Sequence, residues 1–175
     1  CGISEEELHS QMGPDVQVLS DALGIGLDET FARLKTFYDG YHFCEPSPDL
    51  YNPFSLLSAF FNRSIDSYWF GTGTPTSLIK MISSHGWQIA DLESCDALDS
   101  DFDQPTESMD SPLPMLYQAG YLTIKAYDRE STVYTLGIPN QEVSRGLSEN
   151  LVRHVAKGAL TSHNAFLIKL ARDFR

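Results

Sequence analysis

Cysteine is scarce in this sequence, which contains only Cys1, Cys44 and Cys95, and no two of them lie close together. An odd number of widely spaced cysteines gives neither a disulfide framework nor the Cys-x-x-Cys spacing of a zinc knuckle. We therefore expect free thiols, mostly buried.

Long hydrophobic runs are also absent. No apolar stretch approaches the length that spans a bilayer, and the N-terminal residues CGISEEEL have neither a basic start nor a signal-like apolar segment. With 175 residues and 42% hydrophobic content, the chain is long enough to bury a sizeable core as one domain or two small ones. We expect a folded cytoplasmic protein with no membrane partner.

Positive charge is in short supply, because 12 Lys and Arg face 24 Asp and Glu and leave a net charge of −12. A field of this sign opposes nonspecific attraction to nucleic acid and to acidic membranes. The distribution is uneven: residues 91–110 hold eight acids and no base, whereas residues 141–175 hold six bases and three acids. The acidic run fits a solvated surface loop, or a charge-complementary patch for a partner segment.

Complete catalytic signatures are missing. No Gly-Lys dipeptide occurs, which excludes a Walker A loop, and no lysine has an acid two residues before it, which excludes a D/E-x-K signature. The histidines, namely His9, His42, His85, His154 and His163, stand outside any Gly-x-Ser-x-Gly or His-Glu-x-x-His context. We therefore predict no catalytic residue and no metal ligand, and we disfavour a hydrolase.

The chain does contain one clear pair of strands, within Met115–Asn140. Leu122, Ile124 and Ala126 alternate on one side of a polar turn at residues 128–131, and alternation resumes at Tyr134, Leu136 and Ile138. A short helix with Ser111 as N-cap, Pro112 at its first position and Gly120 just past its end should precede the pair, and a helix capped by Asn140 should follow it. Helix, two-strand wing and helix together predict a winged-helix-like module.

Helices account for most of the remaining chain. Ser4 and Glu7 form a capping box, two further amphipathic helices are expected before Tyr38, and Asn52-Pro53 starts another. In that helix we expect Phe54, Leu57 and Phe61 to form the buried stripe. The predicted fold is mainly α with a small β-hairpin, built as a helical lid-type bundle plus the winged-helix-like module.

A Gly-Thr-Gly-Thr run at residues 71–74 precedes a predicted helix over residues 75–84. Exposed N–H groups and the positive end of a helix dipole could hold an anion there. The run also fits a structural turn with Thr74 as helix cap. Thr72, Gly73 and Thr74 are therefore candidate contacts to an anion or a nucleotide.

A predicted helix over Gln141–Lys157 carries two faces. Val143, Leu147 and Leu151 share one stripe, and Arg145, Glu149, Arg153 and Lys157 lie on the opposite side. A basic stripe suits contact with phosphates, although Glu149 between two arginines suits a salt-bridged solvent face equally well. The final segment 161–175 starts another amphipathic helix without a terminator, so we expect a longer protein to continue from it.

Several strings in this order carry a family resemblance. They are Tyr38-Asp39-Gly40-Tyr41, Tyr51-Asn52-Pro53-Phe54-Ser55-Leu56-Leu57, Tyr68-Trp69 with Thr72-Gly73-Thr74-Pro75, Gln118 with Gly120-Tyr121-Leu122-Thr123, and Pro139-Asn140 with Glu142-Val143. Together they resemble the C-terminal half of the AAA-ATPase-like family of bacterial, Bacteroidetes-type proteins, across residues 3–157.

That resemblance implies a lid and winged-helix part, normally preceded by a P-loop ATPase core and followed by a PD-(D/E)XK nuclease-like domain. It implies ATP and Mg²⁺ as cofactors of the parent protein, and none in this fragment. We accordingly expect a helical lid-like subdomain over 1–107, a winged-helix-like subdomain over 108–160, and a linker or next domain from 161. The expected partners are the two adjoining domains of the same polypeptide.

Two functions follow as hypotheses. The first is a noncatalytic regulatory segment that couples an ATPase core to a downstream effector domain. The second is a winged-helix DNA-binding module, with Lys125 and Arg129 on the wing and Arg145 and Arg153 on the following helix as nucleic-acid contacts.

Overall fold

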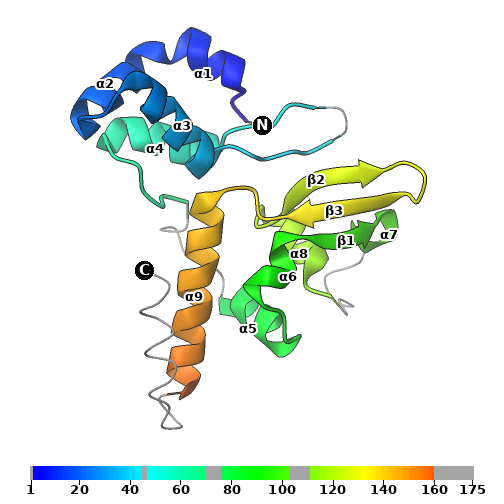
Figure 1. The fold of residues 1–175 in the computed structure, drawn as a ribbon. Coiled ribbons are helices and arrows are strands. Elements are labelled where there is room, and N and C mark those ends of the chain that lie inside the picture. Colours follow the sequence, from blue (N-terminus) through cyan, green and yellow to red (C-terminus); the bar gives the residue numbers. More distant parts are fainter. Residues whose placement is uncertain (1, 45–46, 70–75, 103–110, 160–175) are drawn as a thin grey trace.

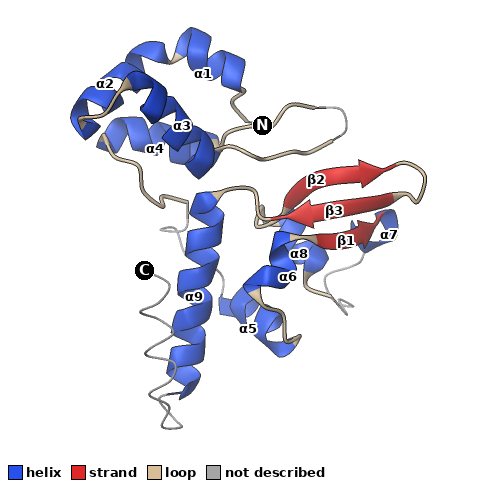
Figure 2. Cartoon of the chain, viewed as in Figure 1, coloured by secondary structure: helices blue, strands red, loops and turns tan. Residues whose placement is uncertain are grey.

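The computed structural model describes residues 2–44, 47–69, 76–102 and 111–159. It consists mainly of helices, with one small antiparallel sheet (Figures 1 and 2). The hydrophobic residues form two clusters. One joins the N-terminal helices, and the other joins the sheet to the later helices.

Four helices make the first cluster, and their bounds are α1 Glu5–Gln11, α2 Gly13–Leu23, α3 Leu27–Tyr38 and α4 Pro53–Asn62. The predicted capping box is present, because the Glu7 amide donates to Ser4 Oγ and the Ser4 amide donates to Glu7 Oε2. Gly24 ends α2 in the left-handed conformation. The helices enclose Leu8, Val16, Leu19, Leu34, Tyr38, Tyr51, Leu56 and Ala59.

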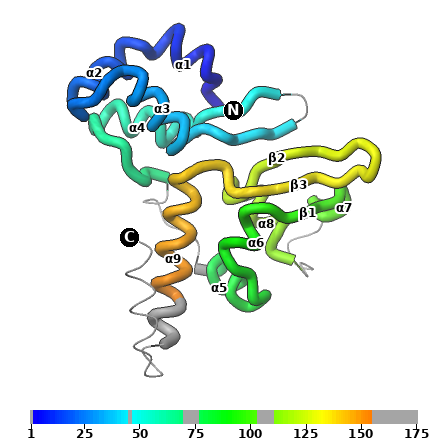
Figure 3. Tube along the Cα trace, in the orientation of Figure 1, coloured from blue at the N-terminus to red at the C-terminus, as the bar shows by residue number. Residues whose placement is uncertain are grey.

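A long excursion of the chain separates α3 from α4 and reaches toward the sheet (Figure 3). Its two ends pair with each other through the backbones of Tyr41 and Leu50. Tyr51, next along the chain, pairs with Ile3 near the N-terminus. These pairings fix the direction in which the chain enters α4.

The second cluster contains the sheet and the helices around it. The strands are β1 Cys95–Leu98, β2 Thr123–Asp128 and β3 Val133–Gly137, in the order β1-β3-β2 with both pairs antiparallel. The helices are α5 Thr76–Ser84, α6 Ile89–Glu93, α7 Asp99–Phe102, α8 Leu113–Gln118 and α9 Gln141–Ala159.

The predicted hairpin is the pair β2 and β3. Ile124 lies opposite Leu136, and an irregularity between Ile124 and Ala126 shifts the register of the remaining pairs. Asp128 closes the turn by accepting from the Glu130 amide and the Ser131 hydroxyl. Asn140 caps α9 as predicted, since its Oδ1 accepts from the Val143 amide.

The predicted fold class, mainly α with a small β-hairpin, is confirmed. Two details were wrong. Residues 95–98 form a third strand inside the acidic run that was expected to be a loop, because they pair with β3. In α4 the buried residues are Ser55, Leu56 and Ala59, so the expected stripe of Phe54, Leu57 and Phe61 points outward.

The predicted domain division at residues 107 and 108 stays a prediction. The residues of the first hydrophobic cluster come from the range 3–68. Helix α5, which precedes the predicted boundary, packs in the second cluster. Within the described parts of the chain, no helix combines the length and the apolar composition needed to cross a membrane.

Candidate functional site

Thr72, Gly73 and Thr74, the predicted anion or nucleotide contacts, lie outside the described residues. They stay a prediction. The described chain stops at Trp69 before them and resumes with α5 after them.

The four predicted nucleic-acid contacts have different surroundings. Lys125 Nζ donates to the Pro139 carbonyl at 3.2 Å, and burial of the amino group lowers its pKa. Arg145 lies over the ring of Phe37, 5.7 Å from the centroid. Both side chains therefore have intramolecular partners.

All four residues are exposed, and the other two, Arg129 and Arg153, lie on the outer surface of the hairpin turn and of α9. Arg153 forms an ion pair with Glu149 at 3.6 Å, one turn back on α9, as the salt-bridged interpretation of this face expects. Arg129 lies at the hairpin turn and has no ion pair or hydrogen bond among the residues that the structure describes. Lys125 thus lies on β2, Arg129 at the turn after it, and Arg145 and Arg153 on α9, and all four stay predicted nucleic-acid contacts.

The described residues of the strings that carry the family resemblance meet where the two hydrophobic clusters touch, and we call this contact the junction. It comprises residues 38–42, 51–55, 66–69, 118–123 and 139–143. Hydrogen bonds across it join residues that lie 28 to 101 positions apart in the sequence.

Glu142, in the first turn of α9, lies at the centre of the junction and is fully buried. Its Oε1 accepts two backbone hydrogen bonds, from Tyr68 N at 2.7 Å and from Trp69 N at 2.8 Å. The Ser55 hydroxyl is close enough to lower the pKa of this carboxyl group, but neither Ser55 Oγ nor Glu142 Oε2 meets the geometry of a hydrogen bond among the described residues.

The environment of Glu142 pulls its pKa in two directions. Burial raises the pKa, and the Ser55 hydroxyl with the amides of Trp69 and Tyr68 opposes that rise; the net change is upward. The N-terminal end of α9 further favours the charged form. One carboxyl group thus ties α9 to the chain that follows α4.

A second tie involves the turn after α3. Asn140 Nδ2 donates to the Asp39 carbonyl at 2.9 Å. Gly40 follows with φ of +93°, and a Cβ atom there would lie 2.3 Å from the Pro139 carbonyl oxygen. Only glycine allows the two segments to approach this closely.

Two more contacts complete the junction. The Tyr38 hydroxyl donates to the Asp66 carbonyl at 2.8 Å and accepts from the Asp66 amide at 3.0 Å. Thr123 Oγ1 accepts from the His42 amide at 2.7 Å and donates to the His42 carbonyl at 2.8 Å. The second pair fastens the excursion after α3 to strand β2.

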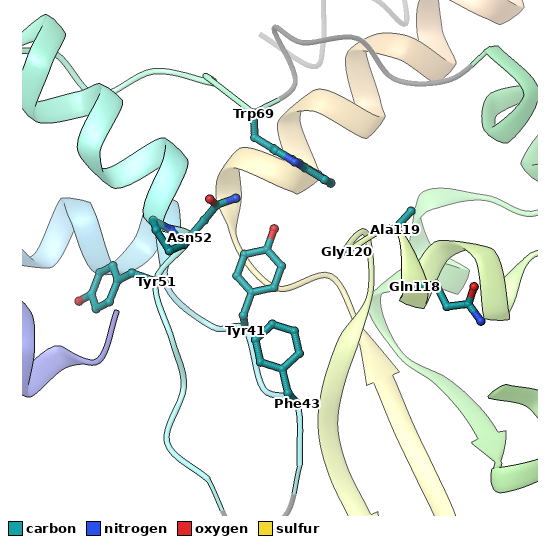
Figure 4. A pocket seen from close by; sticks show the side chains of 9 residues that line it. Tyr41, Phe43, Tyr51, Asn52, Trp69, Gln118, Ala119 and Gly120 are labelled. Atoms are coloured by element: carbon teal, nitrogen blue, oxygen red, sulfur yellow. The ribbon is translucent and has the colours of Figure 1, made fainter. Parts of the chain in front are cut away.

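A small cavity of about 250 Å³ opens at the junction (Figure 4). Its walls include the rings of Tyr41, Phe43 and Trp69, and the Tyr41 hydroxyl is directed toward Asn52 and Trp69. This volume is slightly below the usual range for small-molecule sites.

The described residues contain no group of three or more His, Cys, Asp and Glu side chains that could hold a metal ion. The acidic groups of the junction are instead used structurally. Glu142 accepts backbone hydrogen bonds, and Asp39 is buried at a turn, where desolvation raises its pKa.

Sequence reasoning found the strings but not their meeting point. Tyr38 was interpreted as a packing residue and Asn52 and Asn140 as helix caps, and Glu142 was named only as part of one string, without a structural role. An acid in the first turn of a helix is usually exposed, so the sequence near Glu142 gives no local sign of burial. The only available signal was the fixed order of the strings.

The chain is 33% identical over 183 aligned residues to a protein of Azotobacter chroococcum mcd 1 described as "Uncharacterized protein in vnfD 5'region". The similarity covers 99% of this chain, and the chain spans about a third of that protein. No protein-family model matches the chain, and no solved structure matches it significantly. The resemblance to AAA-ATPase-like proteins therefore stays a prediction.

Proposed function

We propose that this chain is a noncatalytic coupling segment of a larger AAA-type ATPase, linking a nucleotide-dependent core to a downstream nuclease-like effector domain. The observation that carries the proposal is the junction. Two hydrophobic clusters are tied by hydrogen bonds between distant parts of the chain, with Glu142 at the centre.

This geometry suits the passage of a conformational change. Tyr68 and Trp69 come shortly before Thr72, Gly73 and Thr74 in the sequence, the residues proposed to contact nucleotide. Their amides donate to Glu142 at the start of α9. A displacement of residues 68–69 would therefore act directly on a helix of 19 residues. The related protein of Azotobacter chroococcum is about three times as long as the region that matches this chain, which supports a role within a longer polypeptide.

Binding and hydrolysis of nucleotide test the proposal. The isolated chain should neither hydrolyse ATP with Mg²⁺ nor bind it tightly in calorimetry, and a micromolar Kd would contradict the noncatalytic role. The protein encoded by the complete reading frame should hydrolyse ATP, and absence of hydrolysis there would contradict the parent activity.

Coupling is tested in that longer protein by Glu142→Gln. We expect an altered hydrolysis rate with unchanged ATP affinity, because the substitution changes the charge at the junction and keeps an oxygen acceptor. Glu149→Gln is the matched control, since Glu149 is exposed on the same helix. Equal rates for the two variants would contradict coupling through the junction.

Duplex DNA binding is the second candidate. The strand order β1-β3-β2, with α7 and α8 between β1 and β2, favours a winged-helix arrangement. A mobility shift of labelled duplex that weakens with salt and is lost in Arg145→Glu/Arg153→Glu would support DNA binding. The absence of a mobility shift at low salt would contradict DNA binding.

A further inference from the structure

Helix α4 presents three large apolar side chains to solvent. Phe54 and Leu57 are each 51% exposed and Phe61 is 87% exposed. Their spacing of three and four residues puts them on one face of the helix, which we call the α4 stripe. Contiguous exposed apolar side chains of this size are characteristic of interaction sites.

The stripe cannot turn inward without breaking the junction. Asn52 Oδ1 caps α4 by accepting from the amides of Phe54 and Ser55. Leu56 is fully buried in the first cluster, and Ser55 lies beside the Glu142 carboxyl group. A rotation of α4 that buried the stripe would expose these side chains, so the outward orientation is built into the fold.

The composition around the stripe indicates the kind of partner. Residues 53–62 contain no charged side chain, whereas residues 2–69 together contain eleven Asp and Glu against three Lys and Arg. Aromatic side chains without charge are typical of the centre of a protein interface. The acidic surroundings favour a partner surface with an apolar centre and a basic rim.

We propose that the α4 stripe docks against a neighbouring domain of the same longer polypeptide, on an apolar surface rimmed by Lys and Arg; this rests on the proposed role as a coupling segment. The related protein is about three times as long as the matched region, so it has chain enough for such a domain. A net charge of −12 opposes association of two copies and binding to acidic lipid.

The position of the N-terminal backbone fits this partner. Ile3 pairs with Tyr51, and the two backbones exchange hydrogen bonds of 3.3 and 2.8 Å. Tyr51 lies two residues before α4. Any domain joined ahead of Gly2 would therefore start beside the first turn of α4, where tethering gives it a high effective concentration.

Hydrogen exchange in the complete protein and in the isolated chain tests the docking. We expect amides of α4 to exchange at least tenfold more slowly in the complete protein. Phe61→Glu should abolish that difference and leave the unfolding midpoint of the isolated chain unchanged. Leu98→Glu is the matched control, because Leu98 is an exposed apolar residue at the end of β1, outside α4.

Equal exchange of α4 in the two proteins would overturn the proposal. A dimer of the isolated chain in sedimentation that Phe61→Glu converts to monomer would also overturn it, since the occupant would then be a second copy. Cosedimentation with phosphatidylcholine vesicles that Phe61→Glu abolishes would identify a lipid occupant and overturn it too. A complete protein that protects α4 but does not hydrolyse ATP would contradict the ATPase role alone.

Discussion

Replacement of Glu142 gives the sharpest test of the junction. Glu142→Ala removes the acceptor of two buried amides, Tyr68 N and Trp69 N. Hydrogen bonds to a charged group contribute about 1.5–3 kcal/mol each, and buried amides left without an acceptor keep their desolvation cost. Because water entering the vacated space offsets part of this loss, we expect the free energy of unfolding to fall by about 3 kcal/mol.

Glu142→Gln separates the acceptor from the charge. The amide oxygen can accept both backbone hydrogen bonds, and the amide nitrogen can donate toward Ser55. We expect the free energy of unfolding at pH 7 to stay within about 1 kcal/mol of that of the wild-type chain. Glu149→Ala, on the exposed face of α9, should change it by less than about 0.5 kcal/mol, the usual worth of a surface pair.

The direction of the pH dependence follows from the raised pKa of Glu142. Its value in the folded protein exceeds the ordinary 4.5, so folding takes up a proton between the two values. The contribution of Glu142 to stability therefore falls as pH rises from 4.5 through the folded pKa. The stability of Glu142→Gln relative to wild type should rise over the same window.

Urea unfolding followed by the fluorescence of Trp69 and Trp87 measures these differences as shifts of the midpoint. An alanine variant within about 0.5 kcal/mol of wild type would refute the reasoning, since that is the range of ordinary surface substitutions. A glutamine variant as unstable as the alanine variant would also refute it, because the acceptor would then not be the stabilising feature.

Two further predictions concern glycine and cysteine. In urea unfolding, Gly40→Ala should destabilise the chain by at least about 2 kcal/mol more than Gly24→Ala. Both positions have positive φ, but only at Gly40 would a Cβ atom meet the Pro139 carbonyl. Equal destabilisation by the two substitutions would contradict this prediction. Cys95 is half-buried, and burial raises its pKa to about 11. Iodoacetamide at pH 8 should therefore modify the exposed Cys44 at least ten times faster than Cys95, as measured on peptides by mass spectrometry. Faster modification of Cys95 would contradict this prediction.

Features with local causes could be predicted from the sequence. The Ser4–Glu7 capping box, the Asn52 and Asn140 caps and the β2–β3 hairpin all depend on residues within a few positions of each other. Such signals remain visible without tertiary information. They sufficed for the fold class.

Features that depend on distant residues could not be predicted. Strand β1 exists because Cys95–Leu98 pairs with β3, about 40 residues later, and the acidic run of residues 91–110 around it resembles a loop. Helix α4 is apolar on several sides, so its periodicity did not reveal which side faces the core. For the same reason the burial of Glu142 could not be predicted, because its partners lie 73 and 74 residues away.

The distance between Glu142 and its partners also has a consequence for synthesis of the chain. A ribosome completes the backbone of Tyr68 long before it adds the carboxyl group 74 positions later that binds this amide. The four N-terminal helices can therefore pack together while the chain is still growing. The segment that follows α4 can adopt its native conformation only after α9 has begun to emerge from the ribosome. A chain whose synthesis stopped between Trp69 and Glu142 would therefore contain the N-terminal helices, with the amides of Tyr68 and Trp69 exposed to water.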